Sequence, residues 1–220
     1  MKRHHLLWLT YALLGLVPSL VQAQKTTSYD LALLLEQKKL TVYNRTARLS
    51  DNKKAVMLDE KDSSEGLVWL NGVSFSSGTI EIDLKGKDIL QRSFLGVAFH
   101  GINDSTYDAV YFRPFNFHAK DSVRKIHAVQ YISHPVYTWS KLREERNGIY
   151  EKAVISPPDP NGWFHARIEV VGETVQVYVN DIKTASLTIK KLNDRKDGKI
   201  GLWVGAGSGG EFKNLKIIRQ

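Results

Sequence analysis

Alternating apolar and polar positions run through most of the chain and predict short β-strands. The clearest run is residues 78–84, where Ile80, Ile82 and Leu84 share one face and polar side chains occupy the other. A period of two is typical of a strand with one buried face. The same reasoning predicts three further strands, at residues 94–100, 108–113 and 127–132.

The second half of the chain continues as a series of hairpins. From residue 163 onward, β-branched and aromatic residues alternate with polar ones, and Gly172-Glu173, Asn180-Asp181 and Asp197-Gly198 separate the runs. Asn71-Gly72 has the composition of a type I′ turn between two strands. Many short alternating strands with frequent turns predict an all-β sandwich of two antiparallel sheets.

Short helices are predicted at the periphery. Within residues 24–39, three leucines fall on one helical face, so we expect an N-terminal helical segment packed on the domain, with an edge segment as the alternative. Residues 137–147 predict a second helix, with Thr138 as N-cap and Asn147-Gly148 as its end. Residues 40–220 then form one β-domain of ordinary size.

The first 23 residues have the pattern of a signal peptide. A basic start precedes an apolar run at residues 6–20, and Val21-Gln22-Ala23 ends in the small-x-small pattern of a cleavage site. We therefore expect cleavage before Gln24, a periplasmic or extracellular location, and no membrane attachment afterwards. A retained anchor is the alternative, but the apolar run is short and contains a proline and two hydroxyl residues.

The absence of cysteine and the distribution of charged residues exclude some classes of protein. The 220-residue chain has no cysteine, which excludes a disulfide framework and a lipid-anchored cysteine. Loss of Lys2 and Arg3 with the signal reduces the formal charge from +8 to +6. The basic residues are scattered without a nucleic-acid motif, so we expect no nucleic-acid partner. They either keep the surface solvated or favour an acidic polysaccharide.

Polar and aromatic side chains concentrate between residues 94 and 151. Aromatic, amide and guanidinium groups together suit a sugar, which has an apolar ring face and a rim of hydroxyls. A period of two places Tyr111 and Arg113 on one strand face, and His100 joins them if the two strands are neighbours in register. We therefore predict a carbohydrate site whose ligand-binding residues are His100, Tyr111, Arg113, Asn116, Gln130 and Trp139.

Several of these residues also have a purely structural interpretation. Arg113 could be satisfied by a buried carboxylate or by loop carbonyls, and Trp139 could anchor a helix onto the sandwich. Glu144 and Glu145 alternate with basic residues, which is typical of surface ion pairs. Asp108 is the one carboxylate within the predicted strands between residues 94 and 132, so it is the candidate catalytic residue.

Several stretches of the chain match one known family. The longest are GTIEIDLKG at residues 78–86, FLGVAFHG at 94–101, YDAVYFRPFNF at 107–117, AVQYISHP at 128–135 and GKIGLWVG at 198–205. They resemble bacterial secreted 3-keto-disaccharide hydrolase-like domains, also described as family 16 glycoside hydrolase-like. The resemblance covers roughly residues 40–218. It implies a concanavalin A-like jelly-roll sandwich with one or two short peripheral helices and ligand sites on the concave sheet.

One departure from the family 16 pattern bears on mechanism. The active glucanases carry Glu-x-Asp-x-x-Glu on one strand, whereas here Glu81 and Asp83 are followed by Gly86 at the third position. The missing carboxylate disfavours the ordinary retaining mechanism, so we expect Glu81 and Asp83 to form a solvated strand face. The resemblance also implies elimination from a 3-keto sugar, a chemistry that does not need the third glutamate.

The sequence supports a metal site less than it supports a carbohydrate site. The four histidines between residues 100 and 134 lack a tight ligand spacing, so we predict no histidine metal site. Asn103, Asp104, Ser105 and Asp108 are rich in oxygen, and related jelly rolls often hold calcium, but the spacing matches a calcium loop poorly. We expect no cofactor, with a structural Ca²⁺ as the alternative.

Together, these features predict an exported carbohydrate-active protein that binds a glycan on the concave sheet. Whether it also cleaves the glycan stays open at this point. If it does, elimination from a 3-keto sugar is favoured over the ordinary family 16 mechanism. A non-catalytic laminin G or lectin-type module for a polysaccharide or an envelope protein is the alternative. A structural envelope protein is the third hypothesis. No motif fixes the sugar, the linkage or the oligomeric state.

Overall fold

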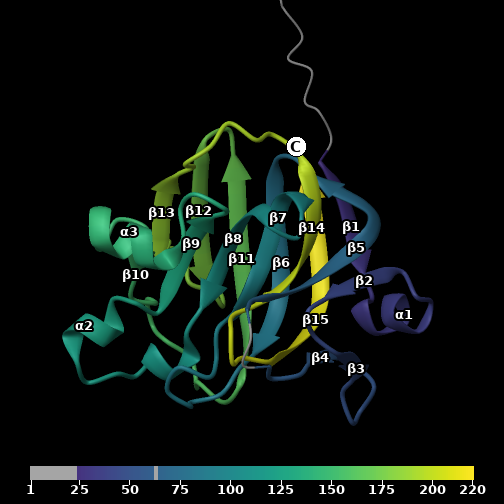
Figure 1. The fold of residues 1–220 in the computed structure, drawn as a ribbon, viewed down its shortest axis with the longest axis horizontal. Coiled ribbons are helices and arrows are strands. Elements are labelled where there is room, and N and C mark those ends of the chain that lie inside the picture. The colour runs from purple at the N-terminus through teal and green to yellow at the C-terminus, as the bar shows by residue number, and fades with distance from the viewer. Residues whose placement is uncertain (1–23, 62–63) are drawn as a thin grey trace, which may run out of the picture.

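A computed structural model describes residues 24–61 and 64–220. The predicted signal peptide at residues 1–23 lies outside the described residues. Two antiparallel sheets stack on one another and confirm the predicted all-β sandwich (Figure 1). Across the described ranges, no helix is long and apolar enough to cross a membrane.

The first sheet, sheet A, has eight strands in the order β13-β12-β11-β6-β15-β4-β3, with β1 also pairing with β15. Every pairing in it is antiparallel, both in the hairpins and between strands that are distant in sequence, such as β6 with β15. Its strands are β1 (Lys25–Tyr29), β3 (Ala47–Leu49), β4 (Val56–Leu58), β6 (Gly78–Lys85), β11 (Trp163–Val171), β12 (Thr174–Val179), β13 (Leu187–Lys190) and β15 (Gly210–Arg219).

The second sheet, sheet B, has seven strands in the order β10-β9-β8-β7-β14-β5-β2. They are β2 (Leu40–Tyr43), β5 (Gly66–Phe75), β7 (Leu95–Asn103), β8 (Thr106–Phe112), β9 (Val129–Ser133), β10 (Glu151–Lys152) and β14 (Gly198–Val204). Helices α2 (Ser122–Lys125) and α3 (Trp139–Glu145) lie beside β9 and β10, and α1 (Leu31–Glu36) lies at the opposite side (Figure 1). A 3₁₀ turn at Pro114–Asn116 follows β8.

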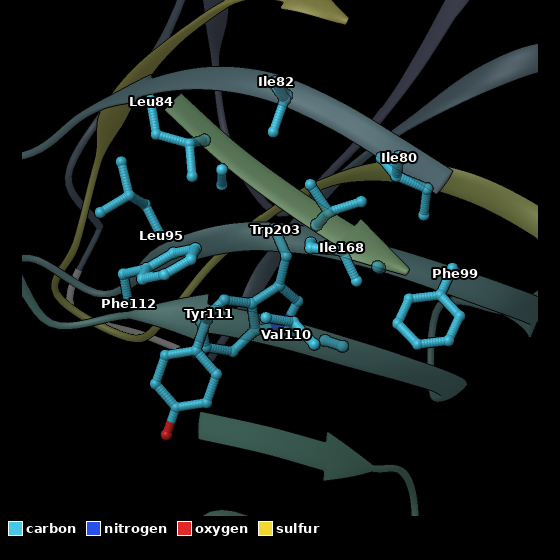
Figure 2. Close-up of a cluster of buried hydrophobic side chains, with 14 of the residues drawn as sticks. Ile80, Ile82, Leu84, Leu95, Phe99, Val110, Tyr111, Phe112, Ile168 and Trp203 are labelled. Atoms are coloured by element: carbon cyan, nitrogen blue, oxygen red, sulfur yellow. The ribbon is translucent and has the colours of Figure 1, made fainter. Parts of the chain in front are cut away.

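The hydrophobic core fills the space between the sheets. Ile80, Ile82 and Leu84 of β6 have no exposed surface; they lie beside Ile168 of the neighbouring β11 and face residues of β7 and β8 in sheet B (Figure 2). Phe112 of β8 meets Phe164 of β11 edge-on, with ring centroids 5.1 Å apart. Each such side chain contributes about 1.5–3 kcal/mol on burial. The alternation predicted for residues 78–84 is therefore confirmed.

The N-terminal segment is helical only in part. Lys25–Tyr29 forms β1 and pairs with the last strand, β15, so the prediction of one helical segment over residues 24–39 is wrong for its first half. Threonine and serine dominate that half, and β-branched residues favour an extended backbone. The helix begins after Asp30, whose side chain accepts a hydrogen bond from the Leu33 amide at 3.0 Å.

The predicted turn at Asn71-Gly72 is also wrong, because β5 runs through it. The Asn71 amide donates to the Lys39 carbonyl at 3.0 Å, and the Thr41 hydroxyl donates to Asn71 Oδ1 at 2.6 Å. Gly72 has a φ of +72°, and the pairing between β5 and β14 shifts register beyond Trp69. The left-handed glycine is thus accommodated as a bulge within one long strand.

Asp108 lies on the inner side of sheet B, facing the interior of the sandwich. Its Oδ1 accepts hydrogen bonds from the Tyr131 hydroxyl at 2.9 Å and from Asn193 Nδ2 at 2.6 Å. Arg195 donates to the same oxygen at 2.8 Å. Asp108 and Phe112 differ by an even number of positions on β8, so both point toward sheet A. The candidate catalytic carboxylate is therefore an internal crosslink in this fold.

His100 turns to the same inner side. Its Nδ1 lies 3.4 Å from Asp108 Oδ2, and its ring stacks on Phe75 at 5.9 Å. The strand alternation fails here because His100 has a φ of +50° and the β7–β8 register shifts between Phe99 and Asn103. The expectation that His100 projects beside the polar face of β8 is wrong for this reason.

The interior network controls the ionisation of Asp108. Burial alone would raise its pKa, but the hydrogen bond from His100, the charge of Arg195 and the hydroxyls of Ser133 and Tyr131 outweigh burial and lower the pKa below its usual value. Burial and the adjacent Asp108 charge raise the pKa of Tyr131, so its hydroxyl remains a donor. Asp108 is thus a stabilising anion at neutral pH.

Replacing Asp108 by asparagine should destabilise the protein in a pH-dependent way. A carboxyl whose folded pKa lies below its unfolded value of about 3.9 stabilises the fold above that pH and loses this contribution as pH falls through the folded pKa. Because Arg195 loses its partner, we expect Asp108→Asn to reduce the free energy of unfolding by about 3–5 kcal/mol at pH 7 and by less at pH 3.

Urea denaturation followed by tryptophan fluorescence at both pH values measures this difference. Glu173→Gln is the control, because Glu173 pairs with Lys190 on the surface and both side chains are about 70% exposed. The control should leave the midpoint unchanged. A deficit of equal size at pH 3 and pH 7 would contradict the assigned ionisation.

Candidate functional site

A groove of ≈ 870 Å³ lies over the outer face of sheet B. Its floor contains Tyr111 of β8 and Trp203 of β14, whose ring centroids are 4.6 Å apart and whose planes are inclined by 35°. Figure 2 shows the Tyr111 hydroxyl pointing away from the β6 residues of the core. Tyr111 thus lies on the opposite side of β8 from Asp108 and Phe112.

A glycine on the intervening strand permits this pair of rings. Gly96 of β7 is opposite Tyr111 on one side and opposite Trp203 on the other. A Cβ at Gly96 would lie 2.0 Å from the Val110 carbonyl oxygen and 2.5 Å from the Tyr111 Cα. The missing side chain at Gly96 therefore leaves room for the two aromatic rings beside it.

Further aromatic side chains form the walls. Phe94 packs edge-on against Phe115 at 5.3 Å and against Tyr111 at 6.2 Å. Trp139, the first residue of α3, is 47% exposed, and the Arg143 guanidinium lies 5.2 Å from its ring centroid. Trp139 is therefore an accessible ring on the groove wall. The predicted N-cap is confirmed, because Thr138 Oγ1 accepts from the Lys141 amide at 3.4 Å.

Arg113 organises the polar part of the floor. It donates to the Tyr111 hydroxyl at 2.6 Å and also to Gln130 Oε1. The Tyr111 hydroxyl in turn donates to Gln130 Oε1 at 2.7 Å. Burial raises the pKa of Tyr111 to about 12, although the Arg113 charge opposes this, so the phenol stays protonated. The structure thus brings together three of the residues that the sequence predicts; their contact with a ligand stays a prediction.

A buried carboxylate holds the groove wall to the sheet. Glu151 of β10 is 2% exposed and accepts from Arg143 Nε at 3.1 Å and from Arg143 Nη2 at 2.9 Å. The His127 Nδ1 lies 2.7 Å from Glu151 Oε2, and Arg113 Nη1 lies 3.5 Å from it. Burial lowers the pKa of His127 despite the opposing Glu151 charge, whereas the hydrogen bond to Glu151 raises the pKa of Arg143.

The structural interpretation of Arg113 is supported by these contacts. Besides Glu151, its Nη1 donates to the His127 carbonyl at 2.8 Å. Both terminal nitrogens are therefore engaged within the protein. Arg113 positions Tyr111 and Gln130, and Gln130 itself is fully buried.

Asn116 contributes to the same end of the groove. Its Nδ2 donates to the His127 carbonyl at 3.2 Å, and its Oδ1 accepts from Arg124 Nε at 3.3 Å. Arg124 also donates to the Phe115 carbonyl at 2.9 Å. Asn116 therefore lines the groove and also holds in place an arginine that the sequence does not single out. Its predicted contact with a ligand stays a prediction.

Sequence reasoning missed a second polar cluster, at the other end of the groove. His134 Nε2 lies 3.5 Å from Glu65 Oε1, and the Tyr107 hydroxyl donates to Glu65 Oε2 at 2.5 Å. The His134 ring stacks on Tyr107 at 5.0 Å, and Trp203 Nε1 donates to the Tyr107 hydroxyl at 3.2 Å. Burial and the Glu65 charge raise the pKa of Tyr107. Of the described residues that line the groove, Glu65 alone carries a carboxylate.

The remaining sequence candidates lie elsewhere. His100 and Asp108 are on the inner side of sheet B, so the geometry gives no support to a role on a groove ligand. Asp104 Oδ1 accepts from Trp69 Nε1 at 2.7 Å, and Asn103 Oδ1 accepts from the Ser105 amide at 2.9 Å. Within the described ranges, no group of three or more His, Cys, Asp or Glu side chains could hold a metal ion. The expectation of no cofactor, with a structural Ca²⁺ as the alternative, stays a prediction.

Solved structures show where this fold occurs. The carbohydrate-binding module CBM66 from Bacillus subtilis has a TM-score of 0.59 and 18% identity, covering 81% of this chain and 95% of that one. A Bacillus subtilis protein with a galectin-like fold has a TM-score of 0.57 and 12% identity, covering 90% and 100%. A glycosyl hydrolase-type protein from Parabacteroides distasonis has a TM-score of 0.52 and 13% identity, covering 83% and 89%.

These likenesses establish the fold, since all three identities are low. Among curated proteins, no relative matches. The model of the 3-keto-alpha-glucoside-1,2-lyase-like domain matches residues 36–218, which include both sheets and the groove. That match confirms the resemblance and extends over most of the chain. The protein belongs to the 3-keto-alpha-glucoside-1,2-lyase-like domain family.

Proposed function

We propose that the groove over sheet B binds a glycan and that the protein does so after export, in the periplasm or outside the cell. The observation that carries this proposal is the arrangement of three aromatic rings, Tyr111, Trp203 and Trp139, within one groove. The apolar face of a sugar ring packs on such surfaces. The likeness to a carbohydrate-binding module supports the proposal.

The exposure of the three rings defines how a sugar would enter. Tyr111 and Trp203 are 1% and 3% exposed, so each offers only a small patch at the base of the groove. Trp139 is 47% exposed and offers the largest accessible surface of the three rings. A sugar would therefore stack on Trp139 and reach the floor with one edge. The groove volume of ≈ 870 Å³ lies within the range of small-molecule sites.

Polar groups stand at both ends of this stacking surface. Arg124 and Arg143 line the groove near Trp139, and their guanidinium groups donate hydrogen bonds to sugar hydroxyls. Glu65 and His134 line the other end and accept hydrogen bonds from such hydroxyls. The groove therefore combines an apolar ring surface with a polar rim, which is the chemistry that a glycan needs.

Replacing Trp139 by alanine should weaken glycan binding about tenfold, since the loss of one central aromatic contact typically exceeds 1 kcal/mol. Affinity electrophoresis against a panel of neutral glycans measures the change. Trp163→Ala, on the outer face of sheet A, is the matched control and should bind as the unmodified protein does. Failure of every glycan to retard the protein, or equal weakening by both variants, would overturn the proposal.

A second function, cleavage by elimination, is favoured by the Glu65–His134 pair. In a 3-keto glycoside, a base takes the proton from C2, next to the ketone. The C1–O bond then breaks, a C1=C2 double bond forms, and the departing oxygen takes up a proton. In this proposal His134 acts as the base, and Glu65, 3.5 Å from its Nε2, stabilises the imidazolium that results.

The distribution of carboxylates supports elimination over ordinary hydrolysis. A glycosidase uses two carboxyl groups about 5–10 Å apart. The described groove lining offers only Glu65, whereas elimination needs one base and a means of stabilising its protonated form. The family name, which refers to a lyase acting on 3-keto-alpha-glucosides, supports the same chemistry.

His134→Gln and Glu65→Gln should each reduce release of the leaving sugar from 3-keto glycosides about 100-fold or more. Mass spectrometry of the products measures release, and deuterium exchange at C2 of the remaining substrate in D₂O reports proton removal directly. His118→Gln is the control, because this histidine is exposed and contacts only the Pro158 carbonyl in the described structure, at 3.0 Å. No release by the unmodified protein, or full release by both groove variants, would refute the elimination and leave glycan binding to the Trp139 test.

A further inference from the structure

A second cavity, of ≈ 640 Å³, lies on the opposite side of the sandwich, over the outer face of sheet A. Strands β6, β11 and β15 form its floor. The junction of β1 with α1 and the loop between β3 and β4 form its walls. The N-terminal segment that the sequence treats as peripheral therefore helps to shape a concave site.

The floor of this cavity is a charged network. His165 Nδ1 lies 2.8 Å from Asp83 Oδ1, and its Nε2 lies 3.9 Å from Glu81 Oε2. Lys216 forms an ion pair with Glu81. The side chains of Glu81 and Asp83 are only 16% and 22% exposed. The sequence predicts a solvated strand face here; in the structure these two carboxylates are mostly buried and are held in a charged network.

A bulge in β15 shapes the cavity and completes the network. The pairing of β15 with β6 shifts register between Lys213 and Lys216, and Asn214 within the shift has a φ of +54°. Its Nδ2 donates to Asp83 Oδ2 at 2.6 Å. Bulges redirect side chains and occur often beside functional sites. Both oxygens of Asp83 are thus engaged, and its side chain is held in one position.

Positive charge remains at the rim. Lys53 and Lys54 are exposed on the β3–β4 loop, and neither forms an ion pair within the described ranges. Lys216, by contrast, is neutralised by Glu81. Tyr29 adds an aromatic ring to the wall. The cavity therefore has an unpaired cationic rim, an aromatic side and a floor of hydrogen-bonding groups.

We propose that this cavity binds a uronate unit of an acidic polysaccharide, at a site separate from the groove over sheet B. The carboxylate of the sugar pairs with Lys53 and Lys54, and its hydroxyls donate to Glu81 and Asp83. A phosphate-type ligand fits less well, because the two floor carboxylates repel a compact dianion. The net positive charge of the chain favours the approach of a polyanion.

Isothermal titration of residues 24–220 with trigalacturonate and with its methyl ester tests the proposal. The acid should bind about tenfold more tightly than the ester, because esterification removes the charge that the lysines recognise. The double variant Lys53→Gln/Lys54→Gln should lose about tenfold in affinity for the acid. Lys38→Gln/Lys39→Gln removes the same charge from another exposed lysine pair and should bind as the unmodified protein does.

Asn214→Gly is a second probe that keeps the fold. Glycine adopts the left-handed conformation of residue 214 without strain, yet it removes the amide that holds Asp83. Binding of the acid should weaken several-fold, and Trp139→Ala in the other groove should leave it unchanged.

Three outcomes would overturn the proposal. They are absence of binding, equal affinity for acid and ester, and an equal loss in the two lysine double variants, which would indicate general charge attraction only. None of them affects the test of the sheet B groove, because that test uses neutral glycans.

Discussion

The buried carboxylate of Glu151 is the group on which the shape of the groove depends. An anion inside a protein is stable only when charges and hydrogen bonds compensate it. Here Arg143 comes from the helix that carries Trp139, His127 from the segment before β9, and Arg113 from the end of β8. The groove wall, the edge strand β10 and the groove floor are therefore all held by the carboxylate of Glu151. Arg113 contacts this carboxylate and also donates a hydrogen bond to the Tyr111 hydroxyl, so it links the two groups.

The fold was predictable because its signal is local. Alternation at residues 78–84 needs no knowledge of the partner strand, since one buried face is enough to fix the pattern. The wrong predictions arise where a partner strand that is distant in sequence determines the local structure. Lys25–Tyr29 becomes a strand because β15, at the other end of the chain, offers a free edge. The bulge at Gly72 likewise depends on β14, which is more than a hundred residues further along.

The same distinction applies to the site. The alternation along β8 correctly puts the Tyr111 side chain on the opposite face from those of its immediate neighbours. Gln130 lies beside Tyr111 because β9 pairs with β8 in register. The prediction for His100 was wrong because its own backbone is left-handed, which turns its side chain to the other face of the sheet. No pattern in the sequence predicts that φ value. Glu65 and His134 were missed because they lie on separate segments that meet only around the Tyr107 ring.

The carboxylates explain why one fold can carry different chemistry on its two faces. Glu81 and Asp83 lie two positions apart on one strand, as in the family 16 pattern, but Lys216, His165 and Asn214 occupy their oxygens. The groove over sheet B lacks such a pair among its described lining residues and holds a carboxylate beside a histidine instead. A paired, neutralised set of carboxylates is suited to holding hydroxyl groups, whereas a carboxylate–histidine pair is suited to moving a proton. The proposed binding on sheet A and the proposed proton transfer on sheet B rest on that difference between the two sets of carboxylates.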